Sequence, residues 1–457
     1  MTGKQHERGV TNFFSHLIPI VKRNTYATRA IVFILNNPLY KGALILGSGT
    51  AVAQVIGIIS MPIITRLYTP SDLGILAVYS SLLAIFGIGA TLRYEFAYTL
   101  PKEDEDAVNL FGLCLMLLCL TTAGFALTLL FGKELLIYIF DIGPIEQYIW
   151  FLLAGFFGMG LYNILNYWAI RRRDYKRITY TKINQGAGGS TCKIFLGILS
   201  FGTTGLIIGH IVSQIAGIGT LARVMWRKEQ ESLKTISLNG MINVAKTYKS
   251  FPVFNFPASI INTMSLQLPP LMLLALYDSQ VVGFYALAHI LVVLPGNVIS
   301  GSMGQAYLGE ASKMVREKSR ELRTLYIQTL RHLTVVGIPL IGVPALCAPF
   351  VVPIIFGEAW TEVGWYCWPL ALMVIAAFVC SPTSFLHIYG YNNWKLIFDI
   401  TRTLAVIIGF YMCKVLGADV LTTLIAYSLI IVIMYIIMIG LNLKAISNFT
   451  SSINTNI

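Results

Sequence analysis

The stretch "LYTPSDLGILA" (Leu67 to Ala77) indicates how this chain is organised, because a related stretch, "LYDSQVVGFYA" (Leu276 to Ala286), follows 209 residues later. Leu, Tyr, Gly and Ala stand at matching places, so that Gly74 corresponds to Gly283. Each copy lies where one long apolar segment ends and the next begins. Glycines at such places permit the close approach of two helices. The spacing therefore predicts a chain built from two repeated halves.

Composition places these halves in a lipid bilayer. Hydrophobic residues make up 56% of the chain and charged residues 12%, whereas a soluble domain carries about 25% charged residues. A segment within lipid must satisfy its own backbone hydrogen bonds, which restricts it to a helix or a closed barrel. The apolar runs are continuous rather than alternating, and this favours helices.

Each helix needs about 20 apolar residues to cross the bilayer. The predicted fold class is an all-α polytopic membrane protein with about twelve transmembrane helices in two six-helix lobes. Six crossings separate the two copies of the repeat, so both have the same orientation and form a parallel pseudo-repeat, with a substrate path between the lobes. The predicted spans are 42–65, 73–92, 107–131, 147–170, 178–200, 203–222, 251–276, 281–309, 333–356, 363–389, 396–414 and 420–443.

The basic residues fall on one side of this topology. Of the 33 Lys and Arg residues, 27 lie in the termini and loops of one side, while the loops of the other side hold Arg66, Lys133 and Lys414. The positive-inside rule then predicts that both termini are cytoplasmic. This distribution accounts for the net charge of +12, so no nucleic-acid partner is expected.

The spans divide the chain into five parts. Residues 1–40 form a predicted cytoplasmic or interfacial extension, because their apolar run is too short to cross the bilayer. The first lobe covers 41–222 and the second covers 251–445, with a cytoplasmic tail at 446–457. The linker at 223–250 is predicted to be amphipathic and to lie at the membrane surface.

Motifs for chemistry are missing from the sequence. It has no phosphate-binding loop, zincin motif, nucleophile elbow or catalytic pair of carboxylates. Its seven cysteines are scattered and follow no metal-binding spacing. The chain is therefore not expected to be an enzyme, and no metal or other cofactor is expected. Coupling to a proton or sodium gradient stays open.

Charged residues within the spans are candidates for function, because each costs about 2.5 kcal/mol or more in lipid. Lys193 lies near the middle of the fifth span, with Lys182 three helical turns before it. Lys182 could instead reach the headgroups. Asp399 and Arg402 are three residues apart, a spacing that permits an ion pair.

Two sets of residues follow from these considerations. Arg66 lies at the outer end of the first span, where it could contact substrate, cap the turn or meet headgroups. A cationic substrate site is predicted from Lys193, Lys182, Arg66 and Arg402. A structural or gating role is predicted for Arg93, Glu95, Asp399, Gly74 and Gly283.

Residues Gly47 to Ala107, which include "RLYTPSDLGILAVYSSLLAIFGIGATLRYEFAYTLPKEDEDA" (Arg66 to Ala107), resemble the opening of the polysaccharide or O-antigen repeat-unit flippases. This Wzx-like family belongs to the multidrug/oligosaccharidyl-lipid/polysaccharide exporter superfamily. The resemblance implies a bacterial inner-membrane protein of lipopolysaccharide assembly. It would move an undecaprenyl-diphosphate-linked oligosaccharide to the periplasmic leaflet, beside other polysaccharide-assembly membrane proteins. A diphosphate needs compensating cations, which matches Lys and Arg within the spans.

Two other functions remain open. A multidrug or other solute exporter of the same superfamily would share the architecture, since a fold does not fix a substrate. A drug cation, however, favours carboxylates over the Lys and Arg found here. A membrane-embedded polysaccharide polymerase or glycosyltransferase is the third alternative, and the short outer loops disfavour it.

Overall fold

The computed structural model describes residues 38–455 apart from 229, 318 and 320, and all regular structure in these residues is helical. The predicted extension at 1–40 lies almost entirely outside the described residues. The helices of the first half are α4 (Pro38–Leu67), α5 (Pro70–Gly87), α6 (Asp104–Phe140), α7 (Ile149–Arg171), α8 (Tyr175–Ile198) and α9 (Gly202–Ile215). Three short helices follow, namely α10 (Ile218–Lys228), α11 (Gln230–Leu233) and α12 (Leu238–Thr247).

The second half begins with a π-helical turn, η4 (Phe251–Asn255), that continues into α13. Another π-helical turn, η5 (Ile338–Gly342), joins α15 to α16. The helices of this half are α13 (Phe256–Leu276), α14 (Ser279–Arg316), α15 (Leu322–Gly337), α16 (Val343–Phe356), α17 (Thr361–Cys380), α18 (Asn392–Val415) and α19 (Val420–Thr455).

Eleven segments of the described chain are long and apolar enough to cross a membrane. The remaining predicted span, the fifth at 178–200, corresponds to α8, which has 24 residues. A helix of that length can cross the bilayer, but α8 carries four basic residues and so is less apolar than the others. The all-α, two-lobe architecture predicted from the sequence is confirmed.

Some predicted boundaries differ from the structure. The sixth span, predicted at 203–222, agrees with the apolar segment Gly202–Arg223, but it contains a break that was not predicted. Helix α9 ends at Ile215, because Gly217 has a φ of 90° and redirects the chain into α10. A Cβ at Gly217 would lie 2.6 Å from Thr181 Cγ2, so a side chain is excluded there for a second reason. The ninth span begins at Leu322 rather than 333. The residues predicted as a tail continue α19 to Thr455.

The two copies of the repeat form the same local structure. Thr69 caps α5 by accepting a hydrogen bond from Asp72 N at 3.2 Å, and Asp278 caps α14 by accepting one from Val281 N at 2.8 Å. Both caps satisfy a backbone N–H that a helix start leaves free. The two capping residues are 209 positions apart, as are Asp72 and Val281.

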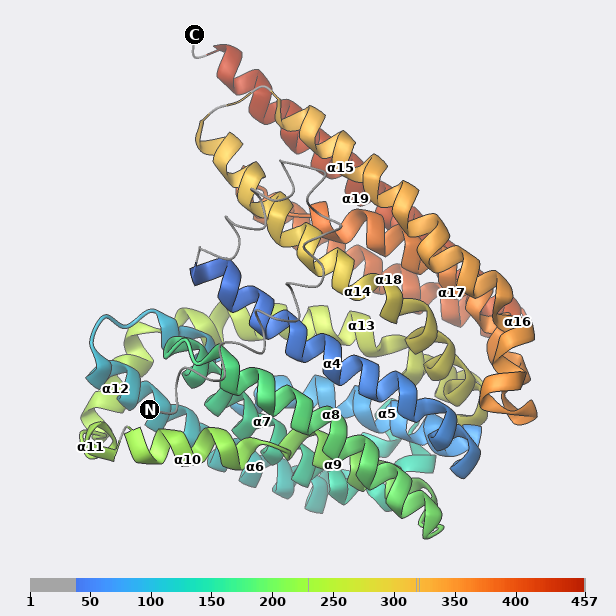
Figure 1. Cartoon of the computed structure of the whole chain (residues 1–457), viewed down its shortest axis with the longest axis horizontal. Helices are drawn as coiled ribbons and strands as arrows, with labels where there is room; N and C mark the ends of the chain where they lie inside the picture. The colour runs from blue at the N-terminus through green and yellow to red at the C-terminus, as the bar shows by residue number, and fades with distance from the viewer. Residues whose placement is uncertain (1–37, 229, 318, 320, 456–457) are drawn as a thin grey trace, which may run out of the picture.

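The two copies also contact each other, at a place that we call the outer junction (Pro70–Gly74 against Ser279–Gly283). Figure 1 shows the helices of the first half (blue to green) converging there with those of the second half (yellow to red). The hydroxyls of Ser71 and Ser279 are 2.5 Å apart. Trp360 Nε1 adds another bond between the halves by donating to Thr65 O at 2.9 Å.

Candidate functional site

The first-lobe part of the candidate site lies on α8. Its glycine-rich stretch allows close packing, since a Cβ at Gly189 would lie 2.5 Å from Ser213 Cβ on α9. Lys193 follows one turn later, and its Cγ would be 2.3 Å from a Cβ at Gly209. The Lys193 carbonyl oxygen accepts a hydrogen bond from Tyr68 at 2.7 Å. These contacts place Lys193 between α8 and α9, within the first lobe.

Aromatic and polar groups surround this position. His210 follows Gly209 on α9, and its ring meets Tyr79 edge to face at a centroid distance of 5.9 Å. Tyr79 donates to Phe151 O at 2.9 Å, which links α5 to α7. Within the part of the chain that the structure describes, no residue forms a hydrogen bond or ion pair with the Lys193 ammonium.

Lys182 lies on the same helix but against a different neighbour. Its Nζ is 4.9 Å from the centre of the Tyr162 ring on α7, a geometry that permits a cation–π interaction. Arg66 is exposed in the last turn of α4. It lies two residues before Tyr68, whose hydroxyl donates a hydrogen bond to the Lys193 backbone. That Lys193 and Lys182 face a cavity between the lobes stays a prediction.

The second-lobe part lies on α18. Arg402 Nη2 is 3.5 Å from Asp399 Oδ1, and Arg402 Nε donates to Ser265 Oγ on α13 at 3.2 Å. Asp399 also pairs with Lys395, one turn before it. Arg402 is only 8% exposed, and its Nη2 has no hydrogen-bond acceptor. The predicted pair therefore forms as part of a three-charge cluster.

Lys193 and Arg402 are equivalent positions in the two lobes, a relationship that the sequence analysis missed. They are 209 residues apart, like Gly74 and Gly283, and each lies in the fifth predicted span of its half, on α8 and on α18. The positions equivalent to Lys395 and Asp399 are Gly186 and Ser190. This replacement explains why the cation is paired in the second lobe and unpaired in the first. Extending the 209-residue offset beyond the first motif would have found it.

Arg93 and Glu95 form a separate cluster between α5 and α6. Glu95 is 2% exposed; it accepts a hydrogen bond from Thr91 and lies 3.6 Å from Arg93 Nη1. Burial raises the pKa of the Glu95 carboxyl above its usual value, against the opposing effects of Thr91 and Arg93. Arg93 has a φ of 67°, a strained conformation for a residue with a side chain.

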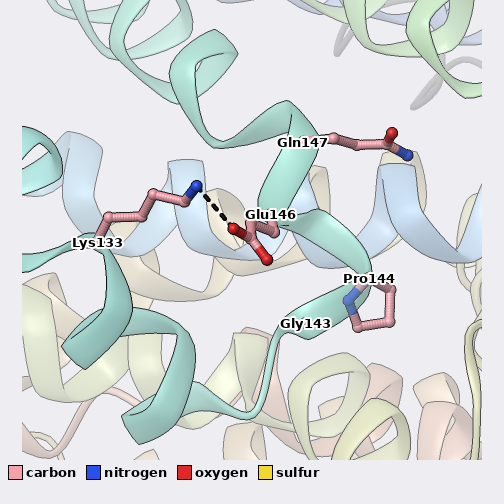
Figure 2. Close-up of a pocket in the computed structure, with 5 residues that line it drawn as sticks. All are labelled: Lys133, Gly143, Pro144, Glu146 and Gln147. Carbon is pink, nitrogen blue, oxygen red and sulfur yellow. Dashed lines mark ion pairs between the residues drawn. The ribbon is translucent and has the colours of Figure 1, made fainter.

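A small pocket lies at the turn between α6 and α7, well separated in sequence from Arg93 and Glu95. Lys133 and Glu146 form an ion pair in it, in which Lys133 Nζ is 2.7 Å from Glu146 Oε1; Figure 2 draws this pair as a dashed line. The pocket has a volume of about 390 Å3, and Gly143, Pro144 and Gln147 complete its lining. It contains none of the predicted site residues. Among the described residues no group of three His, Cys, Asp or Glu side chains could hold a metal ion.

Solved structures with the same fold are membrane transporters. A multidrug-resistance transporter of the MATE family and MOP superfamily, inward-facing, has a TM-score of 0.64 at 16% identity, over 89% of this chain and 95% of its own. The lipid II flippase MurJ, inward closed, has a TM-score of 0.64 at 12% identity, over 89% of this chain and 90% of its own. These likenesses show the fold alone. No curated protein sequence matches the chain.

A sequence-family model described as "Polysaccharide biosynthesis protein" matches residues 63–364. This range runs from the end of α4 to the start of α17 and contains both copies of the repeat and Lys193. It covers well over half of the chain, which therefore belongs to this family of polysaccharide biosynthesis proteins.

Proposed function

We propose that this protein moves an undecaprenyl-diphosphate-linked oligosaccharide repeat unit from the cytoplasmic to the periplasmic leaflet of the bacterial inner membrane. The single observation that carries the proposal is the unpaired ammonium of Lys193 within the first lobe. An uncompensated charge is expensive inside a membrane protein and commonly marks a substrate path. An anionic diphosphate would supply the missing counter-charge.

The substrate class follows from the signs of the interior charges. Lys182, like Lys193, has no carboxylate partner among the described residues. The buried carboxylates of Glu95 and Asp399 are each paired with a cation. The interior therefore has cations available for a ligand, which supports a phosphate-bearing substrate over a drug cation. Membership of a polysaccharide biosynthesis family supports a lipid-linked sugar.

Movement would follow alternating access, without catalysis and without a bound cofactor. The halves contact each other at the outer junction, where the backbones of α5 and α14 touch. Separation of these ends would open the predicted periplasmic side, and closure of the opposite ends would exclude the cytoplasm. A proton or sodium gradient is proposed to bias this cycle.

The decisive experiment depletes the protein in its host and measures lipid-linked oligosaccharide on the inner leaflet. Accumulation that the wild-type gene reverses is expected. A normal inner-leaflet level together with increased drug sensitivity would contradict the proposal and favour a multidrug exporter. Normal translocation with loss of polymerisation would favour an enzyme of polysaccharide assembly.

Variants of Lys193 test the proposed site in the same strain. Lys193→Ala should lose most transport at unchanged protein abundance, because it removes the unpaired interior charge that is proposed to attract the diphosphate. Lys193→Arg should retain part of it, since a phosphate accepts either cation, although Arg is bulkier beside Gly209. Lys176→Gln, at an exposed position on the same helix, is the matched control. An alanine variant with a normal rate of translocation would refute the role of Lys193.

A further inference from the structure

A groove between α6 and α12 lies outside the sites described above. It has a volume of about 380 Å3. The side chains of Leu113 and Met116 on α6, and of Met241 and Ile242 on α12, form apolar parts of its lining. Lys246 and Lys249 also border it. One apolar groove thus carries two adjacent positive charges.

Specific contacts at both ends of α12 fix the position of this helix, which forms one wall of the groove. Asn109 Oδ1 on α6 accepts a hydrogen bond from Ser237 N at 2.9 Å. Gly240 packs on the same amide, since a Cβ there would lie 2.4 Å from Asn109 Oδ1. Near the other end, Tyr94 donates to Ala245 O at 3.1 Å. The bond to Asn109 fixes the start of α12 to α6, and the bond from Tyr94 fixes its other end to the segment that precedes α6.

Within the residues that the structure describes, part of the apolar lining is not covered by protein. Met116 is 40% exposed and Ile242 is 44% exposed. Apolar surface of this kind is disfavoured in water by about 25 cal/mol per Å2. The linker that contains α12 belongs to the side of the chain rich in Lys and Arg, where the predicted topology places the inner leaflet. An acyl chain is therefore the apolar group that this position would meet.

The charges complement a phosphate. Lys246 and Lys249 are three residues apart and both are exposed, and no residue in the described ranges forms an ion pair with either. Basic residues on an amphipathic helix attract anionic lipid.

We propose that this groove binds one anionic phospholipid of the inner leaflet, with its phosphate at Lys246 and Lys249 and an acyl chain along Met116, Met241 and Ile242. The inference is independent of the transported substrate. Its consequence is structural: a bound lipid would fix the linker between the lobes to the membrane, because α12 is already fixed to α6.

Purified full-length protein in neutral detergent tests the proposal by native mass spectrometry. Dioctanoyl phosphatidylglycerol should bind more tightly than dioctanoyl phosphatidylcholine. The Lys246→Gln/Lys249→Gln variant should bind phosphatidylglycerol about 30-fold more weakly, from the usual contribution of a lysine near an anionic surface. Lys176→Gln/Lys313→Gln, which removes two exposed lysines from other helices of the same side, should bind like wild type.

A second variant tests the apolar part and does not alter charge. Met116→Trp fills the groove and should also weaken phosphatidylglycerol binding while the protein keeps its unfolding temperature. Equal binding of the two lipids, or unchanged binding in the double lysine variant, would overturn the proposal. If inorganic phosphate displaces the lipid completely, the acyl chain contributes nothing to binding, and the groove is only an anion site. Polyprenyl diphosphate that displaces it at lower concentration would assign the groove to the transported substrate instead.

Discussion

At the residue scale, Asp399 lies between Lys395 and Arg402 on consecutive turns of α18. The carboxylate therefore balances two cations in an interior where each unpaired charge is unfavourable. Arg402 gains a further bond to Ser265, which ties α18 to α13. Arg402 is thus held by protein groups, whereas none of the described residues bonds to the charged group of Lys193, its equivalent in the first lobe.

Asp399→Asn should destabilise the protein, because it leaves Arg402 buried without its counter-charge. Loss of one partner of a buried pair costs about 3–5 kcal/mol, so the unfolding temperature should fall clearly. Asp141→Asn is the matched control, at an exposed turn with a φ of 49° that asparagine also accepts. Equal unfolding temperatures for the two variants in a thermal melt would show that Asp399 contributes no stability through this cluster.

Glu95 gives a prediction about pH. Because burial raises its pKa in the folded protein, the folded state holds the proton more tightly than the unfolded state. The stability contributed by protonation is complete below the unfolded pKa and is lost as pH rises through the folded pKa. The stability of wild type relative to Glu95→Gln should therefore be greatest in acid and fall toward neutral pH. Thermal melts of both proteins from pH 4 to 8 measure this, and a difference that is constant with pH contradicts it.

At the element scale, the outer junction depends on two glycines. A Cβ at Gly74 would lie 1.7 Å from Ser279 O, and one at Gly283 would lie 1.8 Å from Pro70 O. Both atoms belong to the backbone, so no side-chain rotation can relieve either contact. The ends of α5 and α14 can meet this closely only because both positions lack a side chain.

Gly74→Ala should therefore separate α5 from α14 at the outer junction. The change can be measured with cysteines at Ser71 and Ser279, whose hydroxyl oxygens are 2.5 Å apart. Oxidation should link this pair readily in the parent protein and several-fold more slowly with Gly74→Ala. Gly124→Ala serves as the control, because nothing lies within 4 Å of its added Cβ. Undiminished cross-linking with Gly74→Ala would mean that the junction adapts in another way.

At the scale of the whole molecule, the distribution of Lys and Arg predicts the orientation in the membrane. Single cysteines at Lys176 and Arg316 should be labelled only from the cytoplasm, and one at Gln147 only from the periplasm, in a background without native cysteines. All three side chains are exposed. The assay uses an impermeant maleimide on intact cells and on inverted vesicles. Labelling of residue 176 or 316 in intact cells would reverse the predicted topology.

The repeat explains why much of this fold could be predicted. Three features allowed the prediction: the length of each apolar run, the position of the basic residues in the loops, and the turn that occurs twice. Each can be read from the sequence without knowing which helices pack together. A membrane helix satisfies its own backbone hydrogen bonds, so each segment forms a helix largely independently of the others. The break at Gly217 was not predicted, because the apolar run continues through it. Its φ of 90° and its close packing on Thr181 of another helix leave no trace in hydropathy.

Composition and the recurring turn were enough to predict a helical membrane protein of two similar halves and to locate the charges within its spans. Which of those charges have partners became visible only when the helices were seen packed together. Lys193 and Arg402 have the same offset as the repeat, yet one lies against Gly209 while the other meets Asp399 and Ser265. Pairing depends on which residues of distant helices come within a few ångströms of each other. In a uniformly apolar sequence no local pattern encodes that proximity, because close packing of helices selects it.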